Sequence, residues 1–325
     1  MSRTVADKDG ALMFFGEHEK NVFARQLRKH AGFAGIEVLT WCMMDNHFHL
    51  LVRVPPREAF LEGLMAGGRK RFWKRLGVLY SRDRVKALQK EVAELEKHPG
   101  TERRVEEILG RYTRRMGNLS AFVQGLKFAF SVWFNRKYGR KGTLWMNRFK
   151  SVLLEGEKWV LNKVAAYIDL NPVRAGLVKD PGDYRWSGYG QAVGGVVEAR
   201  RGLSRVYGYG RNAWRQVAAD YRQLLYLEGV EVRDAEGKVE RAGVSAEDAA
   251  REAASRGREG AGKRLGRTVR YYSDGAAVGS REFLEAVFER NRGLFSAKRK
   301  TGARRFRGAE WKGAGMFSLR DLRGR

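Results

Sequence analysis

The chain has 325 residues, 43% of them hydrophobic, and 64 basic against 37 acidic residues give it a formal net charge of +27. Its single cysteine, Cys42, excludes an internal disulfide framework and a zinc ribbon, and no apolar run approaches the roughly 20 residues needed to span a bilayer. A surface this basic attracts polyanions, and nucleic acid is the leading candidate. We expect a cytoplasmic, nucleoid-associated protein without a membrane partner.

The first part of the chain predicts an α+β domain. Residues 16–32 carry apolar side chains at helical spacing, and the strand-like runs Ile36–Met43 and Leu50–Val54 flank Asp45-Asn46. Asp-Asn between two such runs is typical of a hairpin turn. A short strand, a helix and a hairpin are how a ferredoxin-like fold begins, an antiparallel sheet with helices on one face.

The second strand of this hairpin opens with two histidines, His47 and His49. Residues i and i+2 of a strand point to the same face, so the two imidazoles project together while Phe48 faces the other way. Such a pair can hold a divalent metal and leave positions open for a third ligand and a substrate. Two polar residues on a half-exposed strand look the same in sequence, so the spacing alone leaves both interpretations open.

Residues 58–116 predict a helical insertion, because charges dominate there and Pro99-Gly100 interrupts a helical pattern. Ser120–Lys137 predicts a helix whose broad aromatic face belongs to a core. Arg148–Leu154 alternates in the manner of a strand and would place Arg148 and Lys150 on one face, suited to DNA phosphates.

Glu157–Asp169 predicts another helix, which Asn171-Pro172 ends or bends. Tyr167 lies in its last turns, four residues before Asn171, so helical geometry puts the two side chains on one face. Taken alone, Tyr167 is better explained as a half-buried packing tyrosine than as a nucleophile, and Asn171 before proline is a routine helix-end residue. Only in combination with the histidines do they indicate a site.

After residue 190 we expect a basic, mainly helical extension, residues 191–325, with helices at Trp214–Leu227 and Arg281–Arg290. Residues at about 234–262 are expected to form a linker or a loosely held helix. From residue 281 onward there are thirteen Lys or Arg against five Asp or Glu. The densest part of this tail is expected to bind DNA phosphates. Its cations are Lys298, Arg299, Lys300, Arg304 and Arg305.

A same-face histidine pair, a tyrosine late in a helix and a basic surface suit one chemistry. A divalent metal, Mg²⁺ or Mn²⁺, on His47 and His49 would polarise a scissile DNA phosphate, with the amide oxygen of Asn171 as a third ligand. Tyr167 would then attack the phosphorus and form a 5′-phosphotyrosine. That bond keeps the energy of the broken ester, so a 3′-hydroxyl can later rejoin the strand.

Three stretches also carry a resemblance to a known family. They are Met44-Asp45-Asn46-His47-Phe48-His49-Leu50-Leu51-Val52, Gly142-Thr143-Leu144-Trp145 with Arg148-Phe149-Lys150, and Tyr167-Ile168-Asp169-Leu170-Asn171-Pro172-Val173-Arg174-Ala175-Gly176-Leu177-Val178. At these residues the chain resembles the REP-associated tyrosine transposases, a branch of the single-tyrosine HUH transposases.

The resemblance implies a ferredoxin-like catalytic domain over residues 1–190 and a divalent metal. Its substrates would be hairpin-forming single strands of DNA that are nicked and joined during transposition. By position, His47 and His49 match the metal-binding histidines, Asn171 the third ligand and Tyr167 the nucleophile. Arg174 lies in the third motif and is expected to contact DNA.

Other classes of function remain open at the level of sequence. One is a hairpin DNA- or RNA-binding protein without strand transfer, and another is a metal phosphodiesterase that uses water while Tyr167 only packs. Covalent attachment of DNA through Tyr167 separates the first interpretation from both. A monomer and a homodimer are equally compatible with the sequence.

Overall fold

The structure is a computed structural model, and it describes residues 2–4, 15–210, 213–234, 236, 239–254, 275–305 and 316–320. The chain forms two compact units. Unit 1 comprises Met1–Arg3, Leu39–Leu51 and Asn147–Arg325, and unit 2 comprises Thr4–Val38 and Val52–Met146. The boundary predicted after residue 190 lies inside unit 1. In the described ranges, no helix is both long and apolar enough to cross a membrane.

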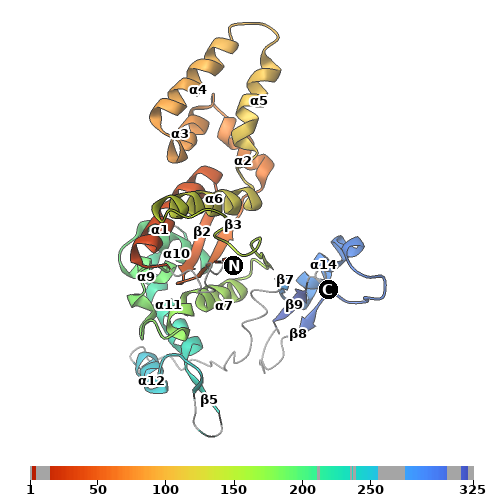
Figure 1. The fold of residues 1–325 in the computed structure, drawn as a ribbon. Coiled ribbons are helices and arrows are strands. Elements are labelled where there is room, and N and C mark those ends of the chain that lie inside the picture. The colour runs from red at the N-terminus through yellow and green to blue at the C-terminus, as the bar shows by residue number, and fades with distance from the viewer. Residues whose placement is uncertain are drawn as a thin grey trace. The chain divides into compact units, whose positions relative to one another are not determined.

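The predicted hairpin is present. Strands β2 (Glu37–Met43) and β3 (His47–Arg53) are joined by a short turn, in which the Met44 amide donates to the His47 carbonyl at 2.8 Å. β1 (Ser2–Arg3) pairs antiparallel with β3, so β3 lies between β1 and β2 (Figure 1). Helix α1 (Glu17–Ala34) lies between β1 and β2 in sequence, which makes this a split β–α–β arrangement. The predicted α+β class is confirmed.

The outer edge of β2 is covered by a distant part of unit 1. The Met43 amide donates to the Trp186 carbonyl at 2.9 Å, and Cys42 forms an antiparallel bridge with Ser187. An edge strand otherwise exposes a row of unpaired amides and carbonyls, and this contact covers the end of that edge at Cys42 and Met43. It also brings the start of α9 beside the hairpin.

The helical insertion predicted for residues 58–116 is confirmed as part of unit 2. Its helices are α2 (Arg57–Met65), α3 (Lys70–Leu79), α4 (Arg82–Leu95) and α5 (Glu102–Thr113). The connection between α4 and α5 contains Gly100, whose φ of 81° lies in the left-handed region that glycine tolerates. The insertion has its own buried cluster, which includes Phe72, Leu76, Leu88 and Ile108.

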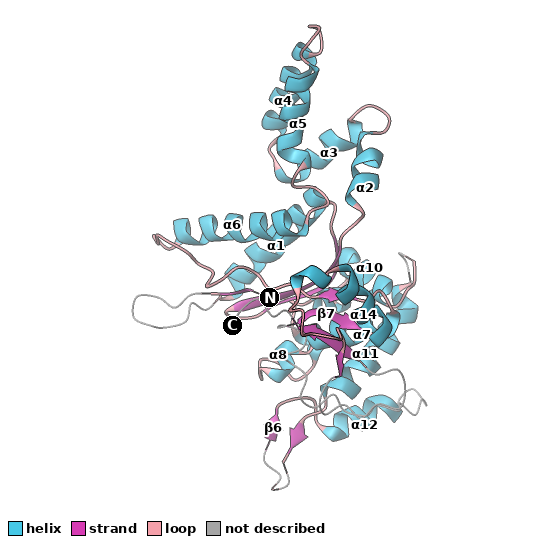
Figure 2. Cartoon of the chain, turned by 90° about the vertical axis from the view of Figure 1, so that its right-hand side faces the viewer, coloured by secondary structure: helices cyan, strands magenta, loops and turns pink. Residues whose placement is uncertain are grey.

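Helix α6 (Leu119–Lys137) confirms the predicted aromatic face. Phe122, Leu126, Phe130 and Phe134 are buried, and α6 lies beside α1 in both ribbon views (Figure 2). The helix begins where Asn118 Oδ1 accepts a hydrogen bond from the Ala121 amide at 3.0 Å, an ordinary N-cap.

The strand predicted over Arg148–Leu154 is much shorter. Only β4 (Leu153–Leu154) is extended and paired, and it pairs parallel with β7 (Gly275–Gly279). Alternation specifies which side chains share a face but not whether a neighbouring strand is present. Because β7 meets the chain only at residues 153 and 154, the first five residues of the predicted strand have no regular partner.

The rest of unit 1 is mainly helical and then returns to a sheet. Its helices are α7 (Lys158–Asp169), α8 (Asn171–Arg174), η1 (Pro181–Asp183), α9 (Gly188–Val193), α10 (Val197–Val206), α11 (Trp214–Gly229), α12 (Ala246–Ala254), α14 (Arg281–Arg290) and η2 (Arg292–Leu294). Strands β8 (Arg304–Arg305) and β9 (Phe317–Arg320) complete a four-stranded sheet in the order β4-β7-β9-β8. The extension is therefore helical, as expected, but it also contributes three strands to a sheet.

The linker predicted at 234–262 is partly structured. Strands β5 (Val232–Arg233) and β6 (Val239–Arg241) form a hairpin, and α12 follows. Arg222 of α11 pairs with Glu252 of α12 at 3.1 Å and holds that helix in place. A polar, alanine-rich composition did not distinguish this docked helix from a linker, and residues 255–262 of the prediction lie outside the described residues.

Candidate active site

The two histidines project from β3 as the alternation predicts. Their ring centroids are 5.0 Å apart at an interplanar angle of 80°, while Phe48 between them is 2% exposed on the other face. His49 is 7% exposed and His47 is half-buried. His47 Nδ1 lies 2.7 Å from Asn46 Oδ1, and an amide oxygen only accepts, so this geometry places the proton on Nδ1. The Nε2 lone pair is then the one that a metal would take.

Tyr167 meets the histidine pair. Its ring packs edge-on against His49, with the centroids 5.8 Å apart and the planes at 90°. Tyr167 is one of the last residues of α7 and is 8% exposed. Burial raises the pKa of its phenol above the ordinary value, because a phenolate loses its hydration there. The two sequence motifs, 118 to 120 residues apart, therefore meet at one place.

Arg174 acts on the same tyrosine. Its guanidinium carbon lies 5.4 Å from the centre of the Tyr167 ring, and Nη1 donates to the Tyr167 carbonyl at 3.4 Å. The positive charge works against burial and lowers the pKa of the phenol. The sequence placed Arg174 among DNA-binding residues, and the structure brings it to the candidate nucleophile.

Asn171 closes the end of the tyrosine helix. Its Nδ2 donates to the carbonyls of Tyr167 at 2.8 Å and Ile168 at 3.2 Å, two groups that the end of α7 leaves without helical partners. With the amide nitrogen committed to the backbone, Oδ1 is the atom that can serve a cation. Asn171 is the first residue of α8, beyond the end of α7, and its contact is with the backbone carbonyl of Tyr167, so the shared face of the two side chains stays a prediction.

A buried carboxylate that sequence reasoning missed anchors the same helix end. Asp169 is fully buried and accepts hydrogen bonds from Thr40 of β2 at 2.9 Å, from the Tyr189 amide at 3.0 Å and from the Tyr221 hydroxyl at 2.6 Å. Burial raises its pKa to about 6, although these donors favour the ionised form. The sequence feature that could have identified Asp169 is that it is the one acidic residue inside the apolar run Ala165–Leu170.

This cluster explains how the site is assembled. Thr40 belongs to β2, the first strand of the histidine hairpin, Tyr189 to α9 and Tyr221 to α11. Each of these three residues donates a hydrogen bond to the carboxylate of Asp169, which is two residues after Tyr167 in the sequence. The end of α7 is therefore tied at once to the hairpin and to two helices of the C-terminal part.

The donor types of His47, His49 and Asn171 are ones that a divalent cation such as Mg²⁺ or Mn²⁺ would accept. Two imidazoles and a neutral amide oxygen leave coordination positions for water and phosphate oxygens, and Mn²⁺ accepts imidazole more readily than Mg²⁺ does. No group of three or more His, Cys, Asp or Glu that could hold a metal occurs in the described parts of the chain. A metal here would therefore depend on His47, His49 and Asn171, with no acidic ligand.

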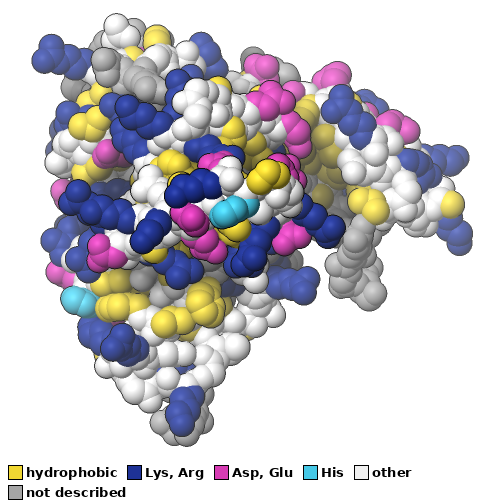
Figure 3. All heavy atoms as spheres, turned by 90° about the horizontal axis from the view of Figure 1, so that it is seen from above, with side chains coloured by type: hydrophobic (Ala, Val, Ile, Leu, Met, Phe, Trp, Pro, Cys, Tyr) yellow, Lys and Arg dark blue, Asp and Glu magenta, His cyan; other side chains and the backbone are white. Residues whose placement is uncertain are grey.

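The other predicted DNA contacts divide into exposed cations and one packed arginine. Arg148, Lys150, Lys298, Lys300, Arg304 and Arg305 are exposed. Figure 3 shows Lys and Arg side chains over much of the face that it displays, with acidic side chains among them. Arg148 and Lys150 precede β4, and the other four lie on the loop and strand that follow η2.

Arg299 is the packed arginine of this loop. Its guanidinium carbon lies 4.9 Å from the Phe295 ring centre, and it donates to the carbonyls of Thr301 at 3.0 Å and Gly302 at 2.9 Å. Burial, followed by the charge of Arg304, lowers its pKa. Arg299 shapes the loop that presents the exposed cations, a role that a basic run in the sequence does not reveal.

Comparison with known proteins adds no relative: no protein-family model, no curated protein and no solved structure matches the chain. The functional argument therefore rests on the residues described above.

Proposed function

We propose that the protein is a metal-dependent endonuclease and strand transferase for single-stranded DNA, a transposase of the single-tyrosine HUH type. The observation that carries this proposal is the edge-on contact of His49 with Tyr167. It joins a same-face histidine pair to a tyrosine more than a hundred residues away, next to an arginine and an asparagine. The hairpin-forming DNA substrate is inferred from the motifs that resemble those of REP-associated tyrosine transposases.

In the proposed reaction, Tyr167 Oη attacks a backbone phosphorus. The Oη–P bond forms, the P–O3′ bond breaks, and the leaving 3′-oxygen takes a proton to become a 3′-hydroxyl. The phenolic proton leaves to solvent, and Arg174 stabilises the phenolate that attacks. A cation held by His47, His49 and Asn171 supplies Lewis-acid polarisation of the phosphate when it is bound. Attack by a 3′-hydroxyl on the phosphotyrosine reverses these bond changes and rejoins a strand.

The test is a cleavage assay on hairpin-bearing single-stranded DNA labelled at its 3′ end, with Mg²⁺ or Mn²⁺, run with the wild type and Tyr167→Phe. The label lies on the fragment that becomes attached to protein. For the wild type we expect a shortened strand and a labelled protein band that survives denaturation. Tyr167→Phe keeps the ring, so the loss of one hydroxyl should cost only about 0.5–1.5 kcal/mol of stability while both products disappear.

The same assay decides between the alternatives. Cleavage that persists in Tyr167→Phe, without a covalent adduct, would support a phosphodiesterase that uses water. Binding of hairpin DNA or RNA without cleavage by the wild type in either metal would support a binding protein, and the proposal would then be wrong.

A further inference from the structure

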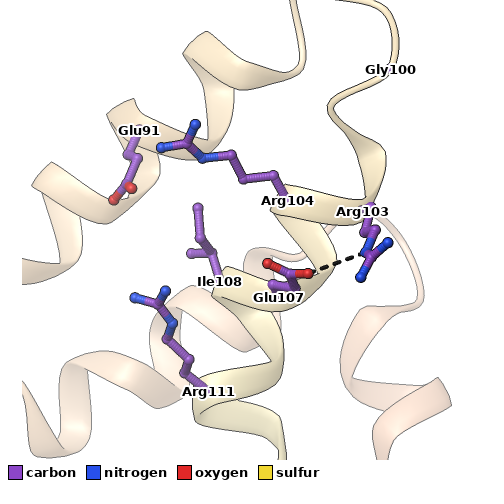
Figure 4. A pocket seen from close by; sticks show the side chains of 7 residues that line it. All are labelled: Glu91, Gly100, Arg103, Arg104, Glu107, Ile108 and Arg111. Carbon is purple, nitrogen blue, oxygen red and sulfur yellow. Dashed lines mark hydrogen bonds and ion pairs between the residues drawn. The ribbon is translucent and has the colours of Figure 1, made fainter.

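An arginine-lined pocket lies between α4 and α5 of the helical insertion, within unit 2. Its volume is about 350 Å³, and it is open to the surface. The lining residues are Glu91 of α4, Gly100 of the connection, and Arg103, Arg104, Glu107, Ile108 and Arg111 of α5 (Figure 4). None of these residues belongs to the candidate active site.

The three arginines of the pocket differ in their partners. Arg103 pairs with Glu107 at 3.3 Å, four residues along the same helix. Arg104 and Arg111 make no ion pair with any described residue, and both are exposed. Figure 4 shows their guanidinium groups extending from α5 toward α4, with Ile108 between them. Two cations thus face one space without an acidic partner.

The helices hold these two arginines at a defined separation. Positions 104 and 111 are two helical turns apart, so their side chains leave the same face of α5 about 10 Å from each other along the axis. Ile108 is only 5% exposed and belongs to the buried cluster that also contains Leu88 and Val92 of α4. Because α4 and α5 share this cluster, the pocket is a feature of a packed helix pair.

We propose that this pocket binds a backbone phosphodiester of a nucleic-acid strand and makes the helical insertion a second DNA-binding surface. Guanidinium groups are well suited to phosphate oxygens, to which they donate in pairs. The lining carries three arginines against two glutamates, a net charge of +1, which matches the single negative charge of a phosphodiester. A free phosphate dianion would leave an uncompensated charge beside Glu91 and Glu107.

The surroundings of the pocket favour a polynucleotide over a small ligand. The insertion contains sixteen Lys or Arg against nine Asp or Glu between residues 57 and 116, so neighbouring phosphates of a strand also meet a positive field. The choice of single-stranded DNA as the strand rests on the proposed function, whereas the anion-binding character of the pocket does not.

The test compares two variants of the full-length protein. Arg104→Gln/Arg111→Gln removes the two cations that face the space, and Arg103→Gln removes the cation that is already paired on the same helix. Affinity for a fluorescent single-stranded oligonucleotide is measured by anisotropy at several salt concentrations. Each lost phosphate contact on a single strand should reduce the slope of log affinity against log salt by about 0.7. Because the pocket is proposed to hold one phosphodiester, we expect the slope of the double variant to be lower by about 0.7.

Arg103→Gln should leave the slope close to that of the wild type. Equal slopes for the double variant and the wild type, with unchanged melting temperatures, would overturn the inference. Equal reductions of the slope for the double variant and Arg103→Gln would also overturn the inference. The lower slope would then reflect the loss of positive charge in general and not the loss of a specific phosphate contact. Binding of millimolar inorganic phosphate to the wild type but not to the double variant, with the same oligonucleotide affinity and salt slope in both proteins, would assign the pocket to free phosphate and would contradict the phosphodiester proposal.

The readout is independent of the cleavage chemistry. Tyr167→Phe tests cleavage and should leave the salt slope intact, whereas the double variant should still cleave DNA at saturating concentration. A protein that cleaves nothing can therefore still confirm the pocket, and one that cleaves normally can still refute it.

Discussion

The surroundings of Tyr167 and the pocket of the helical insertion differ in what determines the positions of their polar side chains. At this site Tyr167, His49 and Asp169 are almost fully buried, and their partners come from β2, β3, α9 and α11. In the pocket, Arg104 and Arg111 are exposed, and the periodicity of one helix determines their arrangement. The first region depends on long-range packing and the second on local helical geometry.

This difference has consequences for how each region responds to change. A buried group surrounded by specific donors loses its function when one atom is altered, because water cannot replace the missing partner. An exposed cation contributes a modest, salt-sensitive increment that adds to others. We therefore expect single substitutions near Tyr167 to abolish activity or stability, and substitutions of exposed cations to shift affinity in small steps.

The largest effect is expected at the histidine pair. His47→Ala or His49→Ala should reduce cleavage about 10³-fold or more, because the proposed metal would contribute several kcal/mol of transition-state stabilisation. Affinity for hairpin DNA should stay within a few-fold of the wild type, since it depends on many phosphate contacts. Cleavage kinetics and anisotropy on the same preparations measure the two quantities. A variant that cleaves at the wild-type rate would show that the imidazole it lacks does not serve a metal.

The next effect concerns stability and its pH dependence at Asp169. Its pKa is raised from 3.8 in the unfolded chain to about 6, so between these values the folded state binds more protons than the unfolded state. The free energy of unfolding should therefore fall as pH rises from about 4 to 6, by up to about 3 kcal/mol from this group, and stay level above.

Asp169→Asn removes this titration and provides the reference. The difference in unfolding free energy between the wild type and Asp169→Asn, from urea titrations at pH 4 to 8, isolates the contribution of this carboxyl from all others. A difference that rises with pH over this window would mean that the hydrogen bonds from Thr40, Tyr189 and Tyr221 outweigh burial.

A smaller effect is expected from the charge beside the nucleophile. Arg174→Gln should raise the pKa of Tyr167 further and slow cleavage about tenfold near pH 7.5, because less phenolate is present. The rate should recover as pH is raised, which displaces the pH–rate profile toward alkaline values. Arg174→Lys keeps the charge and should restore most of the activity. An unshifted profile in Arg174→Gln would limit Arg174 to holding DNA.

The smallest effect is expected on the C-terminal loop. There the structure makes side-chain substitutions a better experiment than a truncation. Deleting residues 298–325 would remove β9, which pairs with β7 and buries Leu319, so a truncation would test folding as well as binding. Substituting Gln for the four exposed cations leaves the sheet intact. These cations are Lys298, Lys300, Arg304 and Arg305.

This fourfold variant should reduce the salt slope for single-stranded DNA by about 0.7 for each cation that contacts a phosphate. Arg233→Gln and Arg251→Gln are suitable controls, because their guanidinium groups already pair with Glu231 and Asp248. A slope that matches the controls would show that the loop is solvated and does not contact DNA.

Local patterns in the sequence were sufficient for much of the candidate site. The turn residues Asp45-Asn46 and the alternation of His47, Phe48 and His49 predicted the hairpin and its shared face. Helical periodicity likewise predicted α6 with its buried face, and the insertion. These features depend on neighbours within a few residues, for which the backbone period alone determines which side chains lie together.

The tertiary structure alone decided which of these local faces meet. Asp169 accepts hydrogen bonds from Thr40, 129 residues earlier, and from Tyr221, 52 residues later. Arg299 belongs to the basic run in the sequence, but its guanidinium group packs against aromatic rings. The predicted strand at Arg148–Leu154 is shortened because β7, more than a hundred residues away, pairs with only two of its residues. Periodicity specifies the face that a residue presents, but its partner depends on how distant segments pack together to bury their apolar surface, which a local pattern does not encode.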